Sequence, residues 1–139
     1  MKYLKYFESS ENDFTLDQRN VLMDEIKYYF TDLEDVGCNV RLTTGSKLIQ
    51  SKSSDLTHFD FNMVNFIKVY ITPENSRSTG KFMESDLFKE VIDVAKDRLS
   101  DKNLFIGDIN QTGSFCSYIE INIYRNEDMD KIKKELRFS

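Results

Sequence analysis

The clearest pattern of apolar and polar positions lies in residues 85–125, where a helical repeat is followed by two alternating stretches. In the first part, apolar side chains recur at the spacing of one buried helix face. This predicted helix buries Leu87, Phe88, Val91, Ile92, Ala95 and Leu99. Residues 104–109 and 115–124 alternate as strands do, and residues 110–114 are predicted to form the turn between them.

The second of these strands has two distinct faces. One face is formed by Ile119, Ile121 and Ile123, and the other by Tyr118, Glu120, Asn122 and Tyr124. A helix and a hairpin that each hide one apolar face pack together as layers, so this unit predicts an α+β domain.

Another helix is predicted to begin near Thr15 and to end at Gly37. Thr15 and Gln18 have the spacing of a capping box, in which each side chain accepts a hydrogen bond from the other residue's backbone N–H. Glycine is typical of the position after a helix. The predicted buried face consists of Leu22, Ile26, Tyr29, Phe30 and Leu33.

The strands between the two helices are less regular. Residues 40–44 are expected to form a strand, Gly45 and Ser46 a turn, residues 47–50 a return strand and residues 51–55 a loop. Residues 59–72 are predicted to form one long strand, which Pro73 ends.

Asn126 is expected to cap a short third helix, which would dock through Met129, Ile132 and Leu136. The elements together predict an α+β fold. We expect a two-layer sandwich with a mostly antiparallel sheet of about five strands, two main helices on one face and a short C-terminal helix. Residues 1–13 are expected to form an N-terminal arm, and residues 14–139 a single domain.

Composition narrows the class of protein. The chain has 139 residues, 40% of them hydrophobic, which is enough for a real core. Its net charge of −5 argues against broad nucleic-acid binding, which needs a dense basic surface. No apolar run is long enough for a membrane span, and residues 1–8 do not read as a signal peptide. Cys38 and Cys116 are therefore expected to be free thiols in a reducing cytosol.

The residues that could carry chemistry are few. His58 is the single histidine, and no nucleophile motif accompanies it, so it is expected at the surface or a strand edge. Two cysteines and one histidine leave a zinc site one ligand short. Asp108, Asn110 and Thr112 match the start of a calcium-binding loop, but its twelfth position is Ile119 instead of glutamate. We therefore expect no enzyme activity, no metal and no cofactor.

Arg77 and Lys81 precede the helix at residue 85 and could hold an anion near its start. The segment is not a P-loop, because Asn75 replaces the first glycine and Phe82 follows the lysine where serine or threonine is needed. A solvated loop is the ordinary interpretation.

One face of the predicted sheet combines aromatic and charged side chains. It consists of Phe66, Lys68 and Tyr70 on one strand and Tyr118, Glu120, Asn122 and Tyr124 on another. Simple packing under a neighbouring segment is the ordinary reason for such a face. Contact with another protein, which favours tyrosine, is a second reason, and stacking on single-stranded nucleic acid is a third.

Two segments resemble parts of known viral proteins. The opening sequence MKYLKYFE and the stretch YFTDLEDVG at residues 29–37 are similar to small uncharacterised proteins of large tailed bacteriophages. The order of helices and strands is also similar to that of head–tail connector proteins, by architecture alone. The resemblance implies a place in the cytoplasm of a bacterial host or in a virion, and it implies no activity.

These observations predict a non-enzymatic small protein that acts through contacts with another protein or a second copy of itself, with no membrane contact. It could be a phage accessory factor or a virion component. One alternative is a single-stranded nucleic-acid-binding module that uses Phe66, Lys68 and Tyr70. Another is an enzyme with an unfamiliar site near His58.

Overall fold

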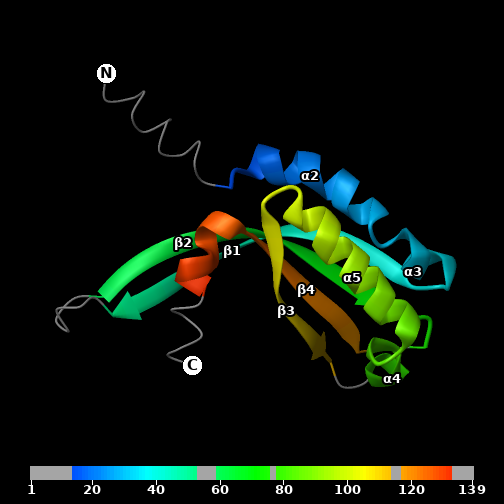
Figure 1. Ribbon diagram of the computed structural model, residues 1–139. Coiled ribbons are helices and arrows are strands. Elements are labelled where there is room, and N and C mark those ends of the chain that lie inside the picture. Colours follow the sequence, from blue (N-terminus) through cyan, green and yellow to red (C-terminus); the bar gives the residue numbers. More distant parts are fainter. Residues whose placement is uncertain (1–13, 53–58, 76–77, 114–116, 133–139) are drawn as a thin grey trace.

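The computed structural model describes residues 14–52, 59–75, 78–113 and 117–132, with backbone alone for residues 50–52 and 59–62 (Figure 1). The predicted arm at residues 1–13 lies outside these ranges, as do His58, Arg77, Cys116 and Leu136.

Four antiparallel strands form one sheet within the described residues. The strands are β1 (Asn39–Lys52), β2 (Phe59–Thr72), β3 (Leu104–Thr112) and β4 (Tyr118–Arg125), in the order β1-β2-β4-β3. The helices are α2 (Leu16–Tyr28), α3 (Thr31–Asp35), α4 (Thr79–Met83) and α5 (Asp86–Ser100). A 3₁₀ turn, η2 (Asn126–Asp128), continues as helix through residue 132. The α+β class is confirmed, and the sheet has four strands where about five were expected.

The missing strand results from a wrong prediction at Gly45 and Ser46, where β1 runs straight through without a turn. Gly45 lies opposite Phe66 on β2, and a Cβ at this position would be 2.6 Å from the Phe66 ring. This glycine therefore makes room for an aromatic ring above the strand, and it does not reverse the chain.

Gly107 has a similar role on the other edge strand. The pairing of β3 with β4 shifts register between Ile106 and Asp108, so Gly107 is an extra residue in a β-bulge. A Cβ here would collide with the Tyr124 ring. The two glycines thus make space at the two edges of the sheet for one row of rings that crosses it.

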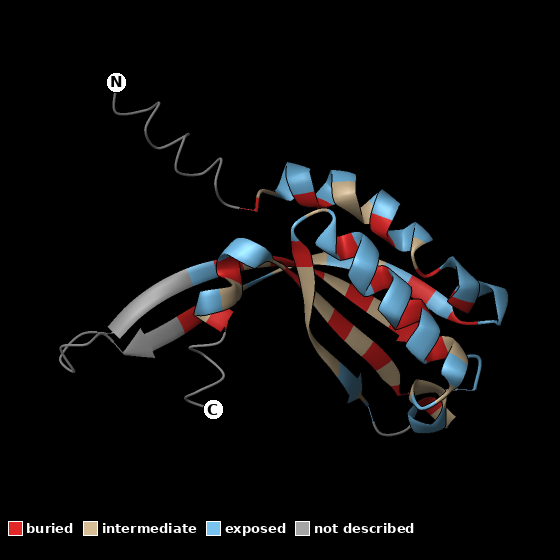
Figure 2. Cartoon of the chain, viewed as in Figure 1, coloured by how far each residue is buried: buried red, intermediate tan, exposed pale blue. Residues whose placement is uncertain are grey.

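The main core lies between the sheet and the helices α2 and α5, which cover the same face (Figures 1 and 2). Ile119, Ile121 and Ile123 of β4 are fully buried there, as their alternation predicts. The capping box at α2 is confirmed, because the Thr15 hydroxyl accepts from the Gln18 N–H at 3.2 Å. The predicted helix divides after Tyr28, and α3 then begins at Thr31.

A second core lies on the opposite face, where the C-terminal segment covers one end of the sheet. Its buried members are Ile49, Val64, Phe66, Tyr124 and Ile132, with Phe105 beside them. The rings of Phe66 and Phe105 lie 5.3 and 5.8 Å from that of Tyr124. The N-cap of this segment is Arg125 with no side-chain capping bond, so the predicted Asn126 cap is wrong by one residue.

Strands β1 and β2 extend past the rest of the sheet. Strand β4 pairs with β2 only over Ile67–Ile71, whereas β1 pairs with β2 as far as Lys52 and Phe59. The excess forms a two-stranded ribbon beyond the core (Figure 1). One side of this ribbon contributes to the second core, and the other side exposes the opposed pair Leu48 and Met63, each 56% accessible.

Candidate interaction face of the sheet

The sheet face opposite α2 and α5 carries polar and aromatic side chains beyond the second core. We call it the open face and define it by Asn39, Arg41, Thr43, Lys68, Tyr70, Thr72, Asp108, Asn110, Tyr118, Glu120 and Asn122. Register places these residues in rows across the four strands. One row is Arg41, Tyr70, Glu120 and Asn110, and the next is Thr43, Lys68, Asn122 and Asp108.

An ion pair joins the two rows. The Lys68 ammonium lies 2.6 Å from a Glu120 carboxylate oxygen, and the two side chains are 25% and 19% exposed. The hydrogen bond to Glu120 raises the pKa of Lys68 above the ordinary lysine value, against a smaller opposing effect of desolvation. Both charges are therefore largely satisfied within the face.

Asp108 is held by three uncharged donors. Its Oδ2 accepts from the amides of Asn110 and Asn122 at 2.7 and 2.9 Å, and its Oδ1 accepts from the Tyr124 hydroxyl at 3.4 Å. The other atom of the Asn122 amide, Oδ1, is buried and has no hydrogen-bond partner among the described residues. These bonds fix the polar row on β4 and β3 and leave one acceptor unused.

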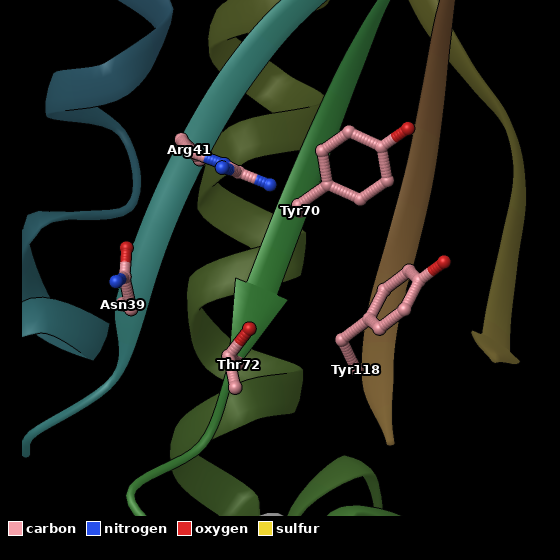
Figure 3. A pocket seen from close by; sticks show the side chains of 5 residues that line it. All are labelled: Asn39, Arg41, Tyr70, Thr72 and Tyr118. Carbon is pink, nitrogen blue, oxygen red and sulfur yellow. The ribbon is translucent and has the colours of Figure 1, made fainter. Parts of the chain in front are cut away.

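At the other end of the face, two tyrosine rings and a guanidinium are grouped. The rings of Tyr70 and Tyr118 meet edge to face, with centroids 5.5 Å apart and planes at 70°. The guanidinium of Arg41 lies over the Tyr70 ring at 5.8 Å. With Asn39 and Thr72, these side chains line a hollow of about 440 Å³ (Figure 3).

The structure brings five of the seven predicted contact residues together on the open face. They are Lys68, Tyr70, Tyr118, Glu120 and Asn122. Phe66 and Tyr124 do not reach the surface, because the second core leaves them 5% and 0% exposed. They lie on the same side of the sheet as the open face, but the C-terminal segment covers them, so they are unavailable to a partner.

Six of the eleven open-face residues were missed from the sequence, and Arg41 and Asp108 are the two charged ones among them. Arg41 lies on the same side of β1 as the other open-face residues of that strand. The expected turn at Gly45 divided β1 in two, so the strand was not recognised as a long partner of β2. Asp108 lies in the strand predicted at residues 104–109, but it was weighed only as the start of a calcium-binding loop. The bulge at Gly107 is what directs its side chain to the open face, toward Asn122.

The structure gives little support to the other sites that the sequence suggested. Lys81 is exposed on α4, and its expected companion Arg77 is outside the described residues. Cys38 is a buried free thiol, and burial raises its pKa. In the described part of the chain, no three His, Cys, Asp or Glu side chains gather closely enough to hold a metal ion.

Among the helices that the structure describes, none is long and apolar enough to cross a membrane. No protein-family model matches the chain, and no curated protein or solved structure is significantly similar to it.

Proposed function

We propose that this protein is a non-enzymatic binding module that takes a protein partner on the open face of its sheet. The observation that carries the proposal is the group formed by Tyr70, Tyr118 and Arg41, which lies on a sheet face away from the helices. Tyrosine and arginine are enriched at protein interfaces and supply much of the binding energy there.

The state of these side chains before binding also favours a contact surface. The Tyr70 ring already rests against Tyr118 and under Arg41, so few rotamers are lost when a partner arrives. The Lys68–Glu120 pair sits beside them with its geometry set. A surface of ordered tyrosines beside fixed charges is suited to specific recognition.

Single-stranded nucleic acid is the weaker candidate. Of the three residues that would stack or pair with it, Phe66 is buried and Lys68 is neutralised by Glu120. The carboxylate of Asp108 lies on the same face, and the chain as a whole carries −5. A polyanion would therefore meet carboxylates where it needs cations.

Two predictions from the sequence remain predictions. An enzymatic site near His58 falls in a segment outside the described residues. The bacteriophage setting, with its place in a host cytoplasm or a virion, rests on the resemblance alone.

The test is capture of partners by tagged protein, with quantitative mass spectrometry and light scattering on the eluted complex. We expect Tyr118→Ala to remove a partner that wild type binds in stoichiometric amount. Tyr28→Ala is the matched control, because that tyrosine is 77% exposed on α2, away from the open face. Equal capture of the partner by both variants would refute the use of this face. Binding of oligothymidylate that is tighter than binding of the captured protein would favour the nucleic-acid alternative.

A further inference from the structure

We infer that Arg41 is the anchor point of the open face and binds the carboxylate of an aspartate or glutamate on the partner protein. This inference rests on the proposed function and specifies the chemistry of what is recognised. It follows from how the charges of the face are already used.

The other charged groups of the open face have internal partners. Lys68 is 2.6 Å from Glu120, and Asp108 accepts hydrogen bonds from the amides of Asn110 and Asn122. Arg41 is exposed. Within the described residues its guanidinium lies over the Tyr70 ring and forms no ion pair or side-chain hydrogen bond. Of the two cations on the open face, Lys68 has a carboxylate partner, and Arg41 has none among the described residues.

The surroundings of Arg41 suit an oxygen ligand. The hollow beside it, about 440 Å³, is lined by the Asn39 amide, the Thr72 hydroxyl and the Tyr118 side chain (Figure 3). Amide and hydroxyl groups can donate to oxygen atoms that the guanidinium already attracts. A guanidinium presents a planar fork that matches the two oxygens of a carboxylate, and the ring of Tyr70 limits its orientation.

Arginine also binds phosphate groups through the same fork, but the carboxylates of the open face argue against a chain of phosphates. Glu120 is the neighbour of Tyr70 in the same row, and Asp108 lies in the next row. A chain of phosphates that reached Arg41 would extend over these carboxylates. A protein segment with one acidic side chain at Arg41 and uncharged or basic residues beyond it avoids that repulsion.

The probe is a short peptide with one acidic side chain, acetyl-Ala-Glu-Tyr-Ala-Ala-amide, titrated into full-length protein and followed by the Arg41 Nε–Hε signal in NMR spectra. Its counterpart with glutamine in place of glutamate supplies the same shape without charge. We expect saturable shifts at Arg41 and Tyr118 with the acidic peptide, and affinity at least about tenfold weaker with the glutamine peptide.

Variants separate this inference from the proposed function. Arg41→Gln should abolish the peptide shifts at Tyr118, and Arg41→Lys should restore them only partly, because the charge returns without the fork. Lys89→Gln removes the same charge from an exposed position of α5 and should leave binding unchanged. Unchanged binding in Arg41→Gln, or tighter binding of a short oligothymidylate than of the peptide, would overturn the inference. If Arg41→Gln retains a partner that Tyr118→Ala loses, the open face remains the binding surface and only the carboxylate anchor fails.

Discussion

The Arg19 guanidinium donates a hydrogen bond of 2.8 Å from Nη1 to the carbonyl oxygen of Gly45. The same side chain reaches the Phe66 carbonyl at 3.5 Å and, through Nε, the Thr15 carbonyl at 3.3 Å. Arg19 is 6% exposed, so these bonds form away from bulk water. One residue of α2 thereby fastens both strands of the ribbon at the point where they leave the sheet.

Replacing Arg19 with methionine should destabilise the protein by about 1–3 kcal/mol, because buried carbonyl oxygens lose a charged donor. The free energy of unfolding in urea measures this. Lys27→Met removes an exposed cation from the same helix and should stay within about 0.5 kcal/mol of wild type. Equal stability of the two variants would contradict a fastening role for Arg19.

Gly45→Ala should also destabilise, by about 1–3 kcal/mol, because the new Cβ would lie 2.6 Å from the Phe66 ring. Adding Phe66→Leu should recover part of this loss in a double-mutant cycle, since the smaller side chain leaves room. Gly80→Ala is the control, because its nearest contact would be an ordinary 3.4 Å from the end of Gln111. If the two alanine variants have the same stability, the close approach at Gly45 is not real.

The course of β1 shows where sequence interpretation stops. Alternation and capping were sufficient for α5, for the two strands after it and for the start of α2, because each signal lies within a few adjacent residues. At Gly45 the local signal was misleading. A glycine in a strand marks either a turn or a close neighbour, and the neighbour, Phe66, is 21 positions away in the sequence.

The candidate site was predictable in part for the same reason. Alternation put Tyr118, Glu120 and Tyr124 on one side of β4, and the structure agrees. It could not show that residues after 125 return to cover Tyr124 and leave Tyr118 uncovered. That division depends on the docking of Ile132, which is a tertiary contact.

The Lys68–Glu120 pair should make the stability of the protein fall as the pH rises through the alkaline range. The folded pKa of Lys68 is raised above its unfolded value, so the contribution is fully present below the ordinary lysine pKa of 10.5 and is lost as pH rises through the folded value. Because the pair is partly solvated, we expect it to contribute about 1 kcal/mol or less to the free energy of unfolding. Comparing urea unfolding of wild type and Glu120→Gln at neutral pH and near pH 11 measures it. A difference that persists unchanged at high pH would exclude the ion pair as its source.

Cys38 should react slowly in the native protein. Burial raises the pKa of its thiol, so little thiolate is present at neutral pH and access is limited as well. In a Cys116→Ser background, we expect alkylation by iodoacetamide to proceed only as fast as the chain opens, and to become rapid in denaturant. Native-state alkylation at the rate of a small free thiol would show that Cys38 is accessible.

The bulge at Gly107 decides what enters each layer of the molecule. Because the pairing skips this residue, Ile106 and Ile109 both pack against the main core, and Asp108 turns away to bond with Asn122. In a regular strand of the same length, without the bulge, Asp108 would face the main core and Ile109 would face solvent. If Gly107 were deleted, Asp108 and the later side chains of β3 would stay on their present sides of the sheet. The hairpin should therefore tolerate deletion of Gly107 better than a change that keeps the residue but removes the bulge.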